Sequence, residues 1–174
     1  MLGRVIAAVL TIAIVLAAFS LVFGFFFPLS RGAIFVPSTR EKTLLMSEMA
    51  EVEPGDRAVD LGSGDGRVVI ELARRGAAAE GYEINPVLVL VSRIAIRTAG
   101  LRGRAAIHWG SFWRADLSRF DAVIVFQGSF VMRRLESKLR RELPRGARVI
   151  SDYWRLPGLA ADTTRGTVYR YRMP

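Results

Sequence analysis

Cysteine is absent from the 174-residue sequence, and histidine occurs only once, at His108. Without cysteine the chain has no disulfide framework, no cysteine-based metal site and no cysteine nucleophile. His108 lies in a strand-like stretch, and we interpret it as a structural residue rather than a catalytic one. The sequence also lacks internal repeats and low-complexity segments, and its length corresponds to one domain with a little left over.

Charged residues are missing from Val5 to Phe27, where the sequence is apolar except for two hydroxyl residues and one glycine. A helix needs roughly 20 such residues to cross the hydrocarbon core of a membrane. A secretory signal peptide has a shorter apolar region, of about 7–15 residues, and a small-residue cleavage site, whereas this run ends in Phe-Phe-Phe-Pro. We therefore expect a transmembrane anchor at residues 1–28. The alternatives are a cleaved signal peptide and a buried core helix.

The positive residues around this run indicate its orientation. Arg31, Arg40 and Lys42 follow it, whereas only Arg4 precedes it, and positive residues near the ends of a span favour the cytoplasmic side. We expect residues 29–38 to be a linker and pre-sheet segment. The rest of the chain is then cytoplasmic, or on the matrix side if the membrane is a mitochondrial inner membrane.

The net charge is +9, and most of the positive charge is arginine, because Lys42 and Lys138 are the only lysines. The densest basic block covers residues 133–148. Leucines recur there every four residues, from Leu135 to Leu143, which predicts an amphipathic helix with a basic outer face. Such a face is either an ordinary solvated surface or one attracted to an anionic membrane. No nucleic-acid-binding motif accompanies the block, so nucleic acid is not an expected partner.

Strand-like and helix-like stretches alternate along the rest of the chain, which predicts a parallel sheet covered by helices. The strand-like stretches are residues 58–61, 79–82, 105–109, 122–126 and 148–152, and the helix-like stretches are residues 67–75, 86–99 and 130–143. Residues 156–160 and 167–172, on either side of 162–166, predict a terminal hairpin.

A helix is also expected before the first strand. Ser38-Thr39-Arg40-Glu41 fits a capping box, with Ser38 at the N-cap and Glu41 three residues later. It predicts a helix over about residues 39–51. The inner face of this helix is expected to carry Leu44, Leu45, Met49 and Val52.

Three glycines follow the first strand in the stretch AVDLGSGDG, residues 58–66. Glycine lets the backbone turn tightly and lets a ligand approach the main chain. In open α/β sheets, ligands bind at the carboxyl ends of the strands, near the point where the strand order reverses. The loop at Gly62, Gly64 and Gly66 is therefore a candidate binding loop, and a bare structural turn is the alternative.

Two acidic residues narrow the choice of ligand for this loop. Glu83 ends the second strand, 21 residues after Gly62, where an acid accepts the hydroxyls of a bound ribose. Asp60 precedes the glycines and is placed to receive a cationic amine. Arg67 stands where a dinucleotide fingerprint has its third glycine, and the P-loop ending is missing. A ligand with an amino-acid end and a nucleoside end fits this pattern, and that ligand is S-adenosylmethionine.

With these residues the sequence resembles the class I methyltransferases, whose Rossmann-like sheet has seven strands. VDLGSGDGR (59–67) is similar to their first motif, and GYEIN (81–85) is similar to the end of their second strand. Together with FVPS (35–38) and GYEINPVLVLVSR (81–93), these motifs resemble a narrower group. This group is the membrane-anchored protein-lysine methyltransferases of the ATP synthase c-subunit and the adenine nucleotide translocase, with their prokaryotic relatives.

The resemblance implies a methyltransferase domain over residues 39–174 and a set of cofactor-binding residues. The implied set is Pro37 and Ser38 over the cofactor, Asp60, Gly62, Ser63, Gly64 and Gly66 at its methionine end, Glu83 and Asn85 at the ribose, and Ser111 near the adenine. Two segments differ from the family pattern. Gly110-Ser111-Phe112-Trp113 replaces a Ser-Asp-Leu-Trp-like stretch, and residues 126–130 replace a Gly-Val-Pro-like segment that faces the substrate.

Methyl transfer from a sulfonium requires alignment of donor and acceptor and exclusion of water, and neither a metal nor a covalent nucleophile is needed. We expect Phe126 and Gln127 to line the acceptor channel, with no dedicated catalytic base. The expected function is methylation of a lysine on a membrane or membrane-proximal protein. The alternatives are methylation of a lipid or small hydrophobic molecule, and a non-catalytic cofactor-binding module.

Overall fold

The computed structural model describes residues 10–12, 14–15 and 38–174. The chain divides into two compact units, Met1–Phe35 and Val36–Pro174. In the first unit, residues 10–12 and 14–15 are helical and exposed, and most of the predicted anchor at 1–28 lies outside the described residues. Within the described ranges, no helix is long and apolar enough to cross a membrane.

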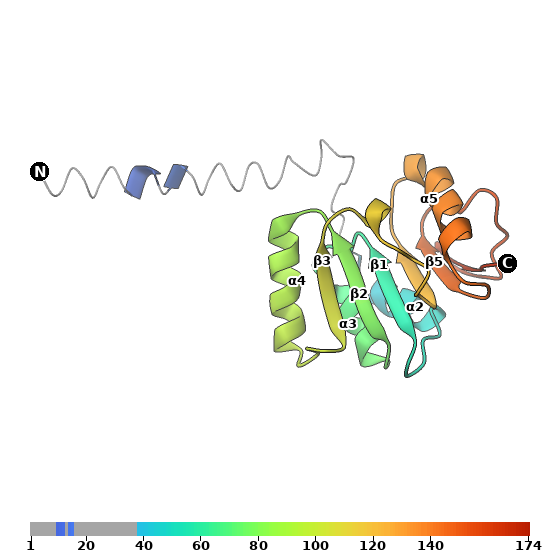
Figure 1. Ribbon diagram of the computed structural model, residues 1–174, viewed down its shortest axis with the longest axis horizontal. Helices are drawn as coiled ribbons and strands as arrows, with labels where there is room; N and C mark the ends of the chain where they lie inside the picture. Colours follow the sequence, from blue (N-terminus) through green and yellow to red (C-terminus); the bar gives the residue numbers. More distant parts are fainter. Residues whose placement is uncertain (1–9, 13, 16–37) are drawn as a thin grey trace, which may run out of the picture. The chain divides into compact units, whose positions relative to one another are not determined.

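A seven-stranded sheet forms the centre of the second unit, as the sequence predicted (Figure 1). In chain order the elements are α2 (Arg40–Met49), β1 (Arg57–Leu61), α3 (Arg67–Arg74), β2 (Ala78–Glu83), α4 (Pro86–Thr98), β3 (Ala105–Trp109), the 3-10 helix η1 (Phe112–Arg114), β4 (Ala122–Val125), α5 (Ser129–Glu142), β5 (Arg148–Asp152), β6 (Thr163–Arg165) and β7 (Val168–Arg172).

The strand order is β3-β2-β1-β4-β5-β7-β6. Strands β1 to β5 pair in parallel, whereas β7 pairs antiparallel with both β5 and β6. The chain moves outward from β1 to β3 and then returns to place β4 on the other side of β1. The sheet therefore has its switch point between β1 and β4, where ligands bind in open α/β sheets.

Helices cover the sheet on both faces. On one face, α2, α3 and α4 bury a core that includes Met46, Leu72 and Ile96. On the other face, α5 packs through Leu135 and Leu139 onto a second core beneath it. Because both faces of the central strands are covered, β4 is fully buried, and its sequence is a continuous apolar run.

Helix α2 begins one residue later than predicted. Its N-cap is Thr39, whose hydroxyl accepts a hydrogen bond from the Lys42 N–H at 3.3 Å. The proposed capping box is therefore wrong, because Glu41 lies two residues after the cap and not three. The predicted inner face is also wrong in part. Thr43 and Ser47 are buried, and Leu44 is 38% exposed.

The terminal hairpin consists of β6 and β7, and its first strand was placed wrongly by the sequence. Residues 156–160 form no strand, and β6 lies inside the segment 162–166 that was predicted to be the turn. Leu156 is nevertheless buried, and its N–H donates to the Tyr171 hydroxyl at 3.1 Å. This apolar side chain reflects core packing and not strand pairing.

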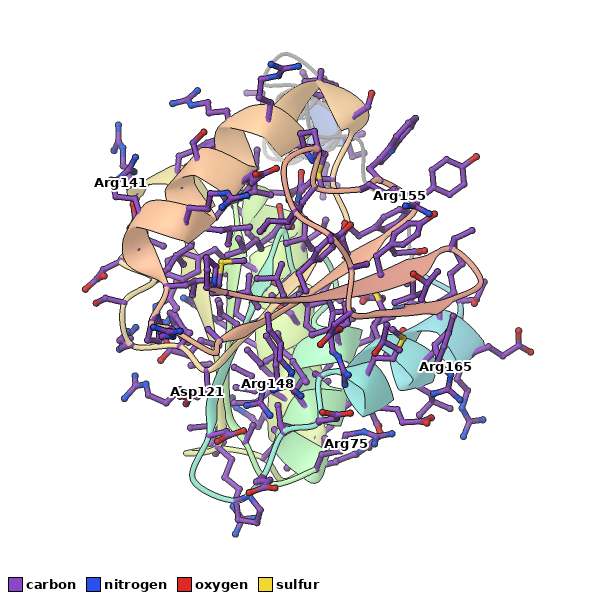
Figure 2. The ribbon with its side chains drawn as sticks, turned by 90° about the vertical axis from the view of Figure 1, so that its right-hand side faces the viewer. Arg75, Asp121, Arg141, Arg148, Arg155 and Arg165 are labelled. Carbon is purple, nitrogen blue, oxygen red and sulfur yellow. The ribbon has the colours of Figure 1, made fainter. Side chains whose placement is uncertain are left out.

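The predicted basic outer face over residues 133–148 is wrong for two of its members. Lys138 is buried and donates to Glu142 and to the carbonyl of Ala115. Arg148 lies on β5 and pairs with Asp56 at 2.6 Å. Arg141 extends outward from α5 (Figure 2).

Candidate active site at the carboxyl ends of the strands

The glycine loop joins β1 to α3 at the switch point. The N–H groups of Gly62 and Ser63 both donate to the carbonyl of Tyr82, at 2.9 and 3.0 Å. The N–H of Gly66 donates to the carbonyl of Ser63 at 2.8 Å. These bonds fold the loop back over the end of β2, so the ends of β1 and β2 form one continuous rim.

Glycine is required at two positions of this loop. Gly62 has a φ of +96°, and a Cβ there would lie 2.3 Å from Nε2 of Gln127. Gly66 has a φ of +82°, and a Cβ there would lie 2.8 Å from the Cβ of Ser92 on α4. Positive φ disfavours a side chain. Gly62 therefore exposes main chain at the rim, whereas Gly66 lets the buried start of α3 pack closely against α4.

Gly81 on β2 has a related role that sequence reasoning missed. A Cβ at Gly81 would lie 2.6 Å from the Cβ of Ser63 and 2.8 Å from Cδ1 of Ile107. The missing side chain makes room for Ser63 against the sheet. The signal was present in the stretch GYEIN, where a glycine interrupts a strand.

Glu83 is 8% exposed at the end of β2, and backbone donors hold its carboxylate. Oε2 accepts from the Gly64 N–H at 2.9 Å, and Oε1 accepts from the Asn85 N–H at 2.7 Å. Asn85 caps α4, and its side-chain oxygen accepts from the Val87 N–H at 2.9 Å. Glu83, the acid predicted to bind the ribose hydroxyls, is therefore oriented by the glycine loop and by the start of α4.

Asp60 is 5% exposed and lies directly before the loop. Burial, with the nearby charges of Glu83 and Asp65, raises the pKa of Asp60 to about 7. No hydrogen bond or ion pair to its carboxylate is formed by any other residue in the range 38–174. A buried carboxylate without a partner is costly, and a ligand cation would supply the missing charge.

Asp65 and Arg67 link the loop to the segment before α2. The Arg67 guanidinium forms a two-point ion pair with Asp65 and also donates to the carbonyl of Ser38. Although burial raises the pKa of Asp65, the hydrogen bonds and charge of Arg67 outweigh it and hold that pKa below its ordinary value. Ser38 is thus tied to the loop, whereas Pro37 lies outside the described residues.

The ends of β3 and β4 complete the rim. Ser111 follows β3 and caps η1, and the neighbouring Gly110 N–H donates to the carbonyl of Glu83 at 2.9 Å. Gln127 follows β4, and its Nε2 donates to the carbonyl of Leu61 at 2.7 Å. The structure therefore brings Ser111 beside the Glu83 backbone and Gln127 beside the glycine loop. Phe126, also expected in the channel, is half-buried in the same segment.

Exposed aromatic side chains lie at the starts of the segments that follow β4 and β5. Phe130 is 72% exposed, Tyr153 is 58% exposed and Trp154 is 40% exposed. Tyr153 has a φ of +70°, which is strained for a bulky residue. Backbone strain of this kind clusters at functional sites. These aromatics mark the open side of the rim.

Sequence reasoning missed a partly buried ion pair at the same edge. Asp152 ends β5, is fully buried, and accepts from Lys42 Nζ at 2.8 Å and from the Thr167 hydroxyl at 2.7 Å. Lys42 lies on α2, 110 residues away in the chain, so no local pattern signals the pair. It fixes α2 to the end of β5 beside Tyr153.

His108 belongs to a different cluster. Its Nε2 lies 2.7 Å from Glu80, which also accepts from Arg57 and Arg119. The imidazole stacks on Tyr82, with ring centroids 4.9 Å apart. These contacts agree with the structural role predicted for His108.

The residues present fit S-adenosylmethionine on three observations. The loop exposes main chain at Gly62, where φ is positive and a Cβ would lie against Gln127. Asp60 provides a buried carboxylate for a cationic group. The hydroxyl of Ser63 is buried without a hydrogen-bond partner among the described residues and can bind a polar ligand atom.

Known proteins resemble this chain in sequence and in structure. Residues 60–163 match the sequence family described as ANTKMT methyltransferase domain. The ATP synthase C-subunit lysine N-methyltransferase of Mus musculus is 38% identical over 80% of this chain and 58% of its own length. A protein-lysine N-methyltransferase of Saccharolobus islandicus strain REY15A is 35% identical over 71% of this chain and 78% of its own length.

A solved structure is similar over nearly its whole length. The RNA methyltransferase from Salinibacter ruber in complex with S-adenosyl-L-homocysteine has a TM-score of 0.78 and 35% identity, over 80% of this chain and 94% of that one. The present chain spans about three fifths of the length of the mouse relative. These similarities confirm S-adenosylmethionine as the cofactor predicted from the sequence, and the chain belongs to the ANTKMT methyltransferase domain family.

Proposed function

We propose that this protein transfers methyl groups from S-adenosylmethionine to a lysine of a membrane or membrane-proximal protein. The observation that carries the proposal is the buried Asp60 carboxylate beside the glycine loop and Glu83, which has no partner within residues 38–174. The lysine acceptor is supported by the names of the mouse and Saccharolobus relatives. The membrane location is supported by the uncharged run from Val5 to Phe27, the predicted anchor.

Each residue of the rim has a proposed part in binding the cofactor. Asp60 and the glycines receive the methionine end, with Ser63 as an additional hydrogen-bond donor. Glu83, held by Gly64 and Asn85, accepts from the ribose hydroxyls. Ser38 closes the outer side of the site, a part that the sequence also predicts for Pro37, and Ser111 lies near the adenine.

The acceptor side is proposed to lie between the segments that follow β4 and β5. When bound, the cofactor supplies a methyl group on a positively charged sulfur, which is already activated for displacement. Phe126 and Gln127 are proposed to position the lysine amine. The exposed rings of Phe130, Tyr153 and Trp154 can attract a lysine ammonium before it loses its proton. A partly desolvated channel favours the neutral amine, because burial lowers the pKa of a lysine.

The test is transfer of labelled methyl groups from radiolabelled S-adenosylmethionine to native membranes, with separate recovery of protein, lipid and RNA. The proposal predicts label in protein whose hydrolysate yields methyl-lysine. The variant Glu83→Ala should lose this label, because its ribose acceptor is gone. Label confined to lipid would support the alternative of a lipid methyltransferase. Label confined to RNA would show that this chain methylates RNA, which is the activity in the name of the Salinibacter protein. Either outcome would refute the proposal, as would the absence of label.

A further inference from the structure

The outer face of α4 is apolar and uncovered. Val87, Leu90, Val91 and Ile94 are 46%, 60%, 44% and 52% exposed, and they follow the i, i+3, i+4, i+7 spacing of one helix face. The opposite face is the one that packs on the sheet, through Val89 and Ile96. A surface helix normally presents polar side chains to water. A continuous exposed apolar stripe marks an interaction surface.

An exposed tryptophan extends this stripe at its N-terminal end. Trp109 ends β3 and is 69% exposed, and its Nε1 donates to the carbonyl of Ile84 at 3.2 Å. The bond holds the indole beside the start of α4, where Val87 begins the stripe. Tryptophan is enriched where an apolar surface meets a membrane interface, because its ring is apolar and its N–H is polar.

The charge around the stripe is mainly positive. Asp65 and Glu71 line the same pocket as Val91, and both are paired, with Arg67 and Arg75. From Ile84 to Ala115 the sequence contains no aspartate or glutamate, and five arginines occur there, at 93, 97, 102, 104 and 114. Arg97 lies one turn after Ile94 and is exposed. Arg93 donates to the carbonyl of Ile107 and so bridges α4 to the edge strand β3. An apolar stripe with arginines beside it, whose nearest acids are already paired with other arginines, complements anionic lipid headgroups above an acyl region.

Other occupants fit this surface less well. A second copy of the chain would bring the same arginines against each other without any acid of this segment to pair with them. A nucleic acid would use the arginines but leave the apolar stripe without a partner. The basic face of α5 is a weaker candidate for the membrane, because Arg140 pairs with Glu136 and Arg141 pairs with Glu142.

We propose that the outer face of α4, with Trp109, lies on the surface of an anionic lipid bilayer. The proposal rests on the proposed function in one respect, since the methylated protein is taken to be in or near that membrane. Because α4 begins at Asn85, beside Glu83, contact through this face places the cofactor rim near the lipid headgroups. This contact is additional to the anchor predicted at residues 1–28.

The absence of cysteine makes a direct test possible. Single-cysteine variants of the full chain, Leu90→Cys and Ile94→Cys on α4 and the matched Arg133→Cys and Ser137→Cys on the exposed side of α5, carry an environment-sensitive fluorophore. Each is reconstituted in vesicles of phosphatidylcholine and phosphatidylglycerol, with or without brominated acyl chains. We expect a blue shift and bromine quenching for both α4 probes and for neither α5 probe.

Several outcomes would overturn the proposal. The first is that the α4 probes stay in a water-like environment. The second is that they shift to the blue without bromine quenching, which would show contact with a protein partner or a second copy. The third is that the α5 probes are quenched as strongly as the α4 probes. A second measurement uses the double variant Leu90→Glu/Ile94→Glu. It should reduce methylation of a membrane-embedded substrate and leave methylation of a soluble lysine peptide unchanged.

The two proposals fail separately. If the wild-type protein methylates no lysine but the α4 probes are quenched, the proposed function is wrong and the membrane surface stands. If lysine is methylated and the α4 probes are not quenched, the membrane surface is wrong and the proposed function stands.

Discussion

Replacing Asp60 with asparagine should stabilise the ligand-free protein at alkaline pH. The folded state raises the pKa of Asp60 from the ordinary 3.8 to about 7. Between these pH values the folded chain keeps a proton that the unfolded chain has released, so the free energy of unfolding falls as the pH rises. The difference of about 3 pH units, at 1.36 kcal/mol each, corresponds to at most about 4 kcal/mol above pH 7. Asp60→Asn is neutral in both states and does not carry this penalty.

The assay is urea unfolding of the full chain in mild detergent, without cofactor, at pH 4 and at pH 8. At pH 8 the variant should be more stable than the wild type by up to about 4 kcal/mol, and at pH 4 the two should be nearly equal. Asp116→Asn is the matched control, because Asp116 is an exposed aspartate and the substitution removes the same charge. The control should show no comparable gain at pH 8.

The same substitution should weaken cofactor binding. A cationic ligand needs the ionised carboxylate, so the affinity of the wild type should fall about tenfold for each pH unit below 7. An alkaline limb should follow as the ligand's own α-amino group loses its proton, near pH 8. Asp60→Asn should remove the acid limb and lower the affinity at pH 7.5 by roughly ten- to hundredfold. A variant that is less stable than the wild type at pH 8, or that binds the cofactor with equal affinity, would refute the reasoning.

Three further substitutions test the site and its supports. Glu83→Gln should weaken cofactor binding roughly ten- to hundredfold by calorimetry. The reason is that the NH2 group of glutamine would face one of the two backbone N–H groups that donate to the carboxylate. Unchanged affinity would show that Glu83 does not belong to the site. Gly66→Ala should lower the free energy of unfolding by more than the roughly 1–2 kcal/mol strain of a positive φ, because its Cβ would lie 2.8 Å from a side-chain carbon of α4. Gly55→Ala, with a φ of +104° and open space, should show the strain alone, and equal losses in urea unfolding would contradict the steric argument. Lys42→Met should destabilise the fold by about 1–3 kcal/mol, since it leaves the buried Asp152 carboxylate without its cation, whereas Lys42→Arg should retain most of the stability. A methionine variant as stable as the wild type would show that the ion pair contributes nothing.

The parallel core of the fold was predictable from local patterns. The predicted bounds of β3 and β5 agree with the structure, because each is a short run with a glycine near one end, Gly110 after β3 and Gly146 before β5. The edge strand β6 was missed. Its residues Thr163–Arg165 are polar and mostly exposed, so no apolar alternation marks them. The burial of Thr43 was also missed, since its hydroxyl is satisfied within α2 by the Thr39 carbonyl.

The sequence predicted those parts of the candidate site that lie within short motifs. The glycine loop and Glu83 lie within 22 residues of each other, and the structure joins them through the Gly64 N–H. The support from Lys42 to Asp152 was not predictable, because it joins residues 110 positions apart that meet only in the folded chain. The sequence predicted a helix at α4 but not its exposed apolar stripe, because periodicity alone does not show which apolar residues stay exposed in the fold.

The pairing of both lysines has a consequence for an enzyme proposed to modify lysine. The chain carries 25 basic residues, yet only Lys42 and Lys138 have a side-chain amine. Lys42 is bound to Asp152, and Lys138 is buried against Glu142. Arginine supplies the remaining positive charge and offers no acceptor for this chemistry. The protein therefore keeps a strong positive charge while presenting almost no lysine acceptor of its own, which would direct the proposed methylation to other proteins.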